Sequence, residues 1–502
     1  MKEYLLGIDI GTSACKVAVL DRDGEAVSSA NGKYPVYYPH PGWAEQSADE
    51  WYEGVIDALR KIWAEGKVKP GDIAGISTDG QSWSAVPVDR DGNTLARTPI
   101  WMDTRSKDIC AEVRARIGAD RLFELAGNDF VPTYTTPKVL WYKKHMPEVY
   151  EKIDKVLLSE AYINFRLTGE MTTDVCGAYG WHCFNMRTGK WDFDMAREIG
   201  IPESFLPPIA ACDEIIGKVT KKAAEETGLM EGTPVVAGGL DAACGTLGAG
   251  VVHAGETQEQ GGQAGGMSIC LTEYKADPRL ILSFHVVPGE WLIQGGTTGG
   301  GGVMRWFEHE FAGEERLREA ETGKSSLTQL NEIAEKVAPG SDGLIFLPYM
   351  SGERTPIWDP NAKGLFYGID FSKTKGHFVR AAMEGVAYAL KHNLDVAEEA
   401  GAKADVLRSM GGSANSLLWT QIKSDVTGKP IVVPSSDSAT ARGAVMLAGV
   451  AIGMYKDYEE AVEITVHDKR SHTPNPDNAA VYQEEYEKYL RLYQELKDEM
   501  AR

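Results

Sequence analysis

Several features that mark other protein classes are scarce or missing in this chain of 502 residues. Lys and Arg number 52 against 73 Asp and Glu, a formal charge of −21 that disfavours nucleic acid and anionic membranes as partners. The longest apolar run, residues 443–455, is too short to span a bilayer. The seven cysteines are scattered, without a C-x-x-C pair or a zinc-binding spacing. No secretion signal opens the sequence either, so we expect a cytoplasmic protein.

Two common phosphate-binding motifs are also missing. Gly323-Lys324-Ser325 has Arg318 where the first glycine of G-x-x-x-x-G-K-[ST] must stand. No G-x-G-x-x-G opens a helix after the first predicted strand. P-loop and dinucleotide-binding folds are therefore disfavoured.

The composition that is present, 43% apolar and 25% charged residues, is ordinary for a globular chain of two or three domains. One strand–turn–strand unit covers residues 4–21, with its turn at residues 11–13. A weaker, Gly-rich unit of the same kind covers residues 257–271. Their spacing suggests two related lobes, which we divide near residue 250 into 1–250 and 251–502. The Gly-rich stretch 245–250 at this boundary is either a hinge or a crowded helix.

Strands and helices alternate along both halves, which predicts an α/β architecture. Strands are expected at 4–10, 15–21, 73–78, 234–237, 257–260, 267–271, 343–347, 406–410 and 431–434. Helices are expected at 48–61, 377–401 and 415–426, and a closing helix after residue 476 carries apolar residues at 482, 486, 489, 493, 496 and 500.

The first turn carries the pattern Asp9-x-Gly11-Thr12-Ser13-x-x-Lys16. A carboxylate at a strand end can hold Mg²⁺ through water. The backbone N–H groups and hydroxyls of the turn suit phosphate oxygens, and Lys16 adds positive charge. The alternative is an ordinary β-hairpin with an acid at its edge.

Asp241 is a single carboxylate between a predicted strand and a helix of small residues. Small neighbours let a substrate approach, and partial desolvation raises the pKa of a carboxyl group toward that of a useful base. The alternative reading makes Asp241 a helix N-cap.

These two motifs occur with two further patterns, Gly411-Gly412-x-x-x-Ser416-x-x-Trp419-x-Gln421-x-x-x-Asp425-Val426-x-Gly428 and Gly443-Ala444-x-x-Leu447-Ala448. Together they resemble the FGGY carbohydrate kinases of the actin-like ATPase superfamily, along nearly the whole chain. Within that family the xylulokinases are most similar, through Trp101-x-Asp103-x-Arg105, Thr135-Thr136-Pro137-Lys138-x-x-Trp141, and the run from Leu347 to Pro356 followed by Asp359-Pro360-Asn361-Ala362.

The resemblance implies two ribonuclease-H-like lobes with ATP and Mg²⁺ in the cleft between them. It implies that Asp241 is the catalytic base that takes a proton from a sugar hydroxyl, and that Asp9 is associated with the metal. The implied nucleotide-binding residues are Gly11, Thr12, Ser13, Lys16, Gly265, Gly266, Gly411, Gly412 and Asn415. The implied sugar-binding residues are Gln81, Trp101, Asp103 and Asp241.

The implied activity is ATP-dependent phosphorylation of a sugar or polyol, with D-xylulose as the leading substrate and a homodimer as the candidate assembly. The alternatives are another substrate (ribulose, erythritol, gluconate or another polyol) and, less favoured, a non-catalytic actin-like ATP-binding protein. Ser82 and Trp83 stand where xylulokinases usually have Met-His. The second Gly-rich turn has no hydroxyl before Ser268, and the N–H groups of its glycines can replace that donor.

Overall fold

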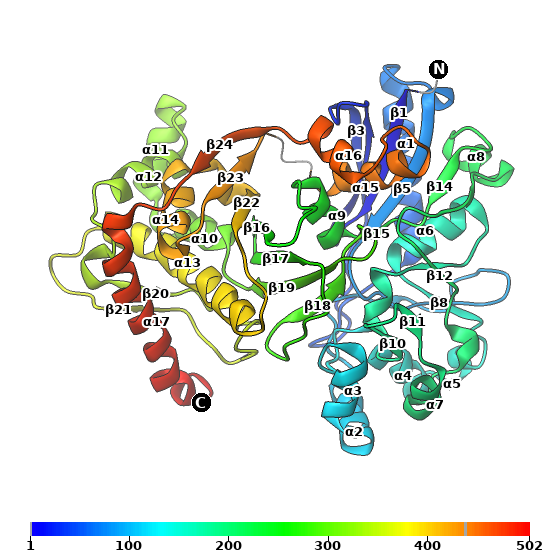
Figure 1. Cartoon of the computed structure of the whole chain (residues 1–502), viewed down its shortest axis with the longest axis horizontal. Coiled ribbons are helices and arrows are strands. Elements are labelled where there is room, and N and C mark those ends of the chain that lie inside the picture. The colour runs from blue at the N-terminus through cyan, green and yellow to red at the C-terminus, as the bar shows by residue number, and fades with distance from the viewer. Residues whose placement is uncertain (1–2, 436–438) are drawn as a thin grey trace.

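The computed structural model describes residues 3–435 and 439–502 and has two seven-stranded sheets, one on each side of Figure 1. The first sheet has the order β13 (Ile215–Lys218), β14 (Pro234–Val236), β5 (Ile73–Gly80), β1 (Tyr4–Ile10), β2 (Ala14–Leu20) and β3 (Ala26–Lys33), and β15 (Gly239–Leu240) also pairs with β5. The second has the order β18 (Ile281–Phe284), β19 (Trp291–Thr297), β17 (Gly265–Leu271), β16 (Glu256–Gly261), β22 (Val406–Met410), β23 (Ile431–Pro434) and β24 (Asp468–His472).

The two sheets share one topology. In the first, β1, β2 and β3 are antiparallel neighbours, whereas β5 and then β14 run parallel to β1. In the second, β16, β17 and β19 are antiparallel neighbours, whereas β22 and then β23 run parallel to β16. The duplication expected from the two strand–turn–strand units is confirmed, and the α/β fold class with it.

The predicted elements agree closely with the observed ones. The expected strands 4–10, 406–410 and 431–434 coincide with β1, β22 and β23. The expected helix 415–426 is in fact a short 3₁₀ turn, η5 (Gly412–Asn415), followed by α14 (Leu417–Thr427). Ser416 separates the two because its hydroxyl accepts the backbone N–H of Trp419 and caps α14.

Helices and short hairpins surround the two sheets. The helices of the first half are α1 (Ala48–Glu65), α2 (Lys107–Ile117), α3 (Ala119–Ala126), α4 (Thr135–His145), α5 (Pro147–Tyr150), α6 (Ser159–Thr168), α7 (Phe193–Ile199), α8 (Lys221–Thr227) and α9 (Asp241–Gly248). Those of the second half are α10 (Gly301–Phe311), α11 (Gly313–Thr322), α12 (Ser326–Glu335), α13 (Lys375–Glu399), α14, α15 (Ala439–Ala451), α16 (Tyr458–Thr465) and α17 (Ala479–Met500). The short strands are β4 (Glu45–Gln46), β6 (Val86–Val88), β7 (Thr98–Pro99), β8 (Lys155–Leu157), β9 (Thr173–Asp174), β10 (Phe184–Asn185), β11 (Lys190–Trp191), β12 (Ile209–Ala210), β20 (Ile345–Leu347) and β21 (Leu365–Tyr367). Across these described residues, no helix is both long and apolar enough to cross a membrane.

The closing helix α17 packs through the apolar stripe read from the sequence. Tyr482, Tyr486, Tyr489 and Tyr493 are buried along one side of the helix. The hydroxyl groups of Tyr489 and Tyr349 form a hydrogen bond of 2.8 Å, which satisfies both groups inside the core of the second lobe.

The chain crosses between the lobes more than once. The helices α15 and α16 come from the second half but lie beside the strands of the first sheet (Figure 1, orange beside blue), and α15 packs on β1, β5 and α9. A Cβ atom on Gly248 would lie 1.8 Å from the Ala439 carbonyl oxygen, and one on Gly443 would lie 1.8 Å from that of Cys244. Of the two alternatives for the Gly-rich stretch 245–250, a hinge or a crowded helix, the structure shows the crowded helix. A division near residue 250 separates the two sheets but leaves α15 and α16 on the first lobe.

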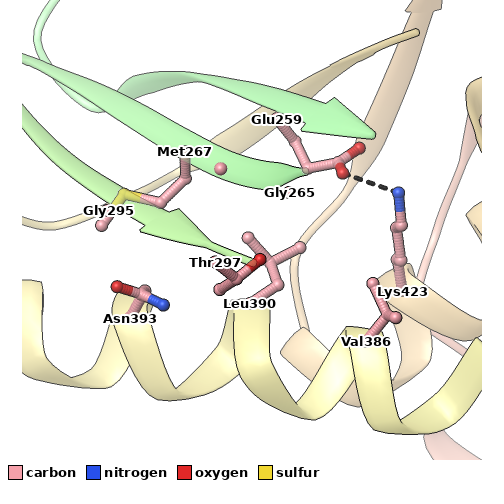
Figure 2. Close-up of a pocket in the computed structure, with 10 residues that line it drawn as sticks. Glu259, Gly265, Met267, Gly295, Thr297, Val386, Leu390, Asn393 and Lys423 are labelled. Atoms are coloured by element: carbon pink, nitrogen blue, oxygen red, sulfur yellow. Dashed lines mark hydrogen bonds and ion pairs between the residues drawn. The ribbon is translucent and has the colours of Figure 1, made fainter. Parts of the chain in front are cut away.

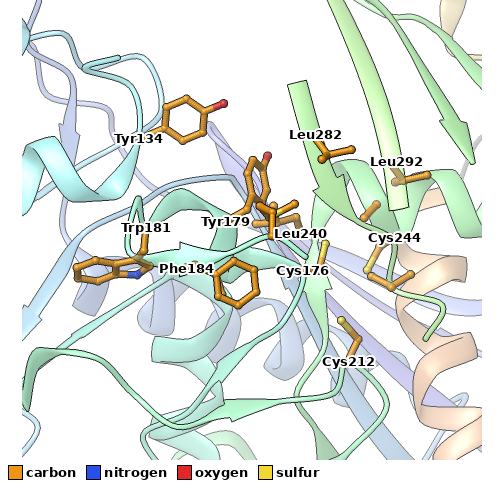
Figure 3. Close-up of a cluster of buried hydrophobic side chains, with 14 of the residues drawn as sticks. Tyr134, Cys176, Tyr179, Trp181, Phe184, Cys212, Leu240, Cys244, Leu282 and Leu292 are labelled. Atoms are coloured by element: carbon orange, nitrogen blue, oxygen red, sulfur yellow. The ribbon is translucent and has the colours of Figure 1, made fainter. Parts of the chain in front are cut away.

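One apolar core continues from the first lobe into the second. Figure 3 shows Leu282 and Leu292, from β18 and β19, beside Leu240 and Cys244 at the start of α9. All four side chains are buried. This contact fixes β18 and β19 against α9, whose first residue is Asp241.

Candidate active site

A cleft with a volume of about 370 Å³ lies between the two lobes, and this volume is in the usual range for small-molecule sites. Asp241 and Trp101 line its first-lobe wall, and Gly265 and Gly266 line its second-lobe wall. The structure thus brings together residues that are far apart in the sequence.

Asp241 is the first residue of α9, directly after the short strand β15. Its Oδ1 accepts the N–H of Ala242 at 2.6 Å, and Leu240 rather than Asp241 holds the N-cap position. Burial and then the negative charge of Asp9 raise the pKa of Asp241 to about 7. A carboxylate with this pKa is a useful proton acceptor near neutral pH.

Asp9 occupies the end of β1, opposite Lys16 in β2 and Asp79 in β5. Burial raises the pKa of Asp9 to about 6, although a hydrogen bond with Asp79 and the charge of Lys16 lower it. Asp79 of β5 pairs with Asp9 of β1 and with Gly239 of β15, two residues before Asp241, so the sheet brings Asp9 and Asp241 to the same edge.

Asp79 is a buried acid that the sequence reading did not identify. It is fully buried, and no N–H or hydroxyl group of the described residues donates to its carboxyl oxygens. Burial and the negative charges of the nearby Asp9 and Asp241 hold the pKa of Asp79 well above its usual range. Only the parallel register of β1 and β5, which pairs Asp9 with Asp79, reveals this contact.

Aromatic rings form the rest of the first-lobe wall. Trp101 donates its indole N–H to the Thr12 hydroxyl at 3.0 Å and so joins the wall to the first turn. Trp83 and Tyr179 also line the cleft, and the Trp83 ring lies 4.3 Å from that of Tyr134. Trp83 has a φ of 60°, unusual for a residue with a side chain, and its buried indole N–H has no acceptor among the described residues.

Two expected sugar-binding residues do not line the cleft. Gln81 is 1% exposed and donates its amide to Gln46, which in turn donates to the Thr12 carbonyl. Asp103 is fully buried, where its carboxylate accepts the N–H of Ala44 and the guanidinium of Arg105. Both side chains therefore support the wall from behind in this structure, and the sugar contact expected for them stays a prediction. Their chain neighbours Ser82, Trp83 and Trp101 reach the cleft instead.

The second Gly-rich turn connects β16 and β17. Gly411 has a φ of 84°, and a Cβ atom there would lie 3.0 Å from the carbonyl oxygen of Gly261, so the turn after β22 sits against this loop. Gly412 and Asn415 in that turn are exposed, and a Cβ atom on Gly412 would meet nothing within 4 Å. The turn that carries Gly411 and Gly412 thus lies beside the start of the second Gly-rich turn, and nucleotide binding by these residues stays a prediction.

A buried ion pair ties these segments together (Figure 2). The ammonium of Lys423, on α14, lies 2.6 Å from Oε1 of Glu259, on β16, and donates to the Ser413 hydroxyl at 2.7 Å. The side chains of Lys423 and Glu259 are 1% and 4% exposed. Because the pair joins the strand before the Gly-rich turn to η5, it positions both.

Two family descriptions match this chain. The N-terminal domain of the FGGY family of carbohydrate kinases matches residues 4–248, and the C-terminal domain matches residues 269–452. The chain belongs to the FGGY family of carbohydrate kinases. It is therefore a phosphotransferase that acts on a sugar or related alcohol, in a family that uses ATP.

Similar proteins extend over the full length of this FGGY kinase. A xylulose kinase of Bacillus subtilis strain 168 is 31% identical over 498 residues, 99% of this chain and 98% of the relative. A gluconokinase of the same organism is 30% identical, covering 96% of this chain and 94% of the relative. The crystal structure of xylulose kinase from Rhodospirillum rubrum superposes with a TM-score of 0.89 at 30% identity, covering 99% and 100% of the two chains.

Proposed function

We propose that this kinase transfers the γ-phosphoryl group of ATP to a hydroxyl group of a pentulose, with D-xylulose as the leading substrate. The observation that carries the proposal is Asp241, an acid with a pKa of about 7 at the wall of a cleft between an aromatic surface and two Gly-rich turns. The similarity to xylulose kinases supports the choice of a pentulose.

Asp241 acts as the general base. Its carboxylate takes the proton of the substrate hydroxyl as the oxygen attacks the γ-phosphorus, and the bond between that phosphorus and the β-phosphate oxygen breaks to release ADP. The N–H of Ala242 fixes the carboxylate in place. Burial holds the pKa of Asp79 well above its usual range, which disfavours a further negative charge beside the incoming phosphates.

The phosphates bind between the two turns. In the proposal they contact the first turn through Gly11, Thr12, Ser13 and Lys16, and the second through Gly265 and Gly266. Backbone N–H groups at glycines suit this role because no side chain blocks the approach of the phosphate oxygens. The adenosine then rests against Gly411, Gly412 and Asn415.

The residues at the first turn fit Mg²⁺. Asp9 is a partly buried carboxylate beside hydroxyl groups, and the ion in kinases takes one or two carboxylates and the nucleotide phosphates. Among the described residues, no group of three or more His, Cys, Asp or Glu side chains could hold a metal ion. An ion that arrives with the nucleotide does not need such a group, because the phosphates and water supply most of its ligands. When bound, Mg²⁺ supplies positive charge to the phosphate oxygens.

The sugar rests against Trp101, Trp83 and Tyr179 on the first-lobe wall. These rings offer apolar faces on which the carbon-bound hydrogens of a sugar can rest. Gluconate is the second candidate, because Ser82-Trp83 replaces the Met-His of xylulokinases and because one relative is a gluconokinase. The cytoplasmic location and the homodimer stay predictions.

A substrate panel tests the proposal. ADP release is measured with D-xylulose, L-xylulose, both ribuloses, erythritol, glycerol and gluconate, with the Asp241→Asn variant as the control for contaminating kinases. We expect the highest kcat/KM with D-xylulose. A higher value with gluconate selects the second candidate, and ATP turnover that is indifferent to every compound contradicts the proposal.

A further inference from the structure

Arg354 belongs to the loop that follows β20 and lines the cleft from the second lobe. A Cβ atom on Gly296 of β19 would lie 2.9 Å from its Nη2, so the guanidinium covers this glycine. The neighbouring Thr355 hydroxyl accepts the N–H of Gly296 at 2.6 Å and donates to its carbonyl oxygen at 3.1 Å. Two hydrogen bonds thus anchor the segment that carries Arg354 to the strand.

The guanidinium has few partners of its own. In the described part of the chain it forms no salt bridge, and its one hydrogen bond is a long contact of 3.4 Å to the Thr297 carbonyl. Glu353, next in the sequence, accepts the N–H groups of Thr298 at 2.7 Å and of Arg354 at 2.8 Å through Oε1. Its Oε2 is buried without a hydrogen bond, so among the described residues neither oxygen is bonded to the guanidinium. A partly buried cation with most of its donors unused favours an anionic ligand.

The surface beneath Arg354 has no side chains. Gly296 in β19 pairs directly with Gly266 in β17, and residues directly opposite in antiparallel strands direct their side chains to the same face. Two glycines side by side therefore leave that face of the sheet bare. Gly266 lies at the start of β17, directly after the second Gly-rich turn, so the guanidinium of Arg354 beside β19 lies one strand away from the expected phosphate loop.

We propose that Arg354 binds the phosphoryl group in transit between ATP and the sugar, from the second-lobe wall of the cleft whose first-lobe wall carries Asp241. The inference rests on the proposed kinase function and adds a residue to it. As the bond from the γ-phosphorus to ADP breaks and the bond to the sugar oxygen forms, the proton goes to Asp241. Arg354 contacts the non-bridging oxygens, whose charge it stabilises. A planar guanidinium suits this task because it donates to two oxygens at once.

Kinetics of Arg354→Ala and Arg354→Lys test the inference. A guanidinium on a transferred phosphoryl group contributes about 10³- to 10⁵-fold in GTPases. We therefore expect kcat to fall at least about 100-fold for Arg354→Ala and about tenfold for Arg354→Lys, whereas KM for the sugar changes by less than about threefold. Added guanidinium ion is expected to restore part of the activity of Arg354→Ala.

The matched control is Arg380→Lys. Arg380 is also a largely buried arginine of the second lobe, but it bonds to Glu384 and Tyr482 on α13 and α17, away from the cleft. This variant is expected to keep its kcat. The Arg354 variants and the control are also compared by thermal unfolding.

Three results would overturn the inference. A rise in the sugar KM at unchanged kcat means that Arg354 holds the sugar, for example a sugar acid. Unchanged kinetics mean that it contacts no reactant, and equal losses of kcat and stability in Arg354→Lys and Arg380→Lys mean a structural role. If Arg354→Ala fails to fold, Arg354→Lys decides. Failure of the proposed function itself is distinguishable, because then the wild-type protein shows no sugar-dependent ADP release.

Discussion

The substitution Asp241→Asn separates the catalytic role of Asp241 from a structural one. Asparagine keeps the shape of the side chain, and its carbonyl oxygen can still accept the N–H of Ala242. It removes the proton acceptor, and general-base catalysis is worth about 10²- to 10⁴-fold. We expect kcat to fall at least about 100-fold, with little change in the dissociation constant of the sugar.

The same substitution is expected to stabilise the fold at neutral pH. The pKa of Asp241 rises from 3.8 to about 7 on folding, so the folded state holds the proton more tightly than the unfolded state. Its ionisation therefore costs stability, and this cost is absent below about pH 4 and complete above about pH 7. The rise in the pKa of Asp241 from 3.8 to about 7 corresponds to a loss of ~4 kcal/mol of folding free energy at most. Because the side chain is partly open to the cleft, we expect a gain of about 1–2 kcal/mol for Asn.

Two measurements check this prediction, kcat by coupled ADP release and thermal unfolding at about pH 4 and about pH 8. Asp108→Asn is the matched control, because Asp108 is an exposed carboxylate in the first turn of α2 and lies outside the cleft. It is expected to leave kcat unchanged. Wild-type turnover in Asp241→Asn would refute the assignment of the base. Lower stability at about pH 8 would refute the argument that the buried charge is costly.

Three further substitutions test the surroundings of the base. Trp101→Phe keeps a ring but reduces the aromatic face on which the sugar rests in the proposal, so the KM for the sugar should rise about 3- to 10-fold. An equal rise in the KM for ATP would mean that Trp101 acts only through its bond to Thr12 and supports the first turn. Lys423→Met leaves Glu259 buried without its cation and should lower the free energy of unfolding by about 3–5 kcal/mol, as measured by thermal unfolding. Adding Glu259→Gln should recover part of this loss of stability, and no recovery would count against the ion pair. Gly412→Val places a side chain in open space, so the stability of the fold should not change, whereas ATP binding should weaken about tenfold in calorimetry. Loss of sugar binding as well would contradict the assignment of Gly412 to the adenosine site.

Much of the fold follows from local patterns. The short apolar-rich runs of β1, β22 and β23 and the helical stripe of α17 locate these elements almost to the residue. The repeated strand–turn–strand unit also indicates the duplication of the sheet. The assignment of α15 and α16 to the first lobe was not predictable, because it depends on the close contact of Gly248 with α15.

Sequence patterns indicate the motifs around Asp9 and Asp241 and the Gly-rich turns, because each motif is a short segment with its own backbone requirement. Which side chains face the cleft is another matter. Trp83 and Arg354 line it, whereas Asp103, in a motif that resembles a sugar-binding one, is buried behind the wall.

The sequence by itself therefore determined the α/β class, the two lobes and the family of the chemistry. Only the tertiary structure decided that Asp79 is buried opposite Asp9, that Gly266 and Gly296 leave a bare face below Arg354, and that Lys423 pairs with Glu259. The reason is physical. Strand register and helix packing bring residues far apart in the chain into contact, and both burial and charge, which set a pKa, depend on those contacts.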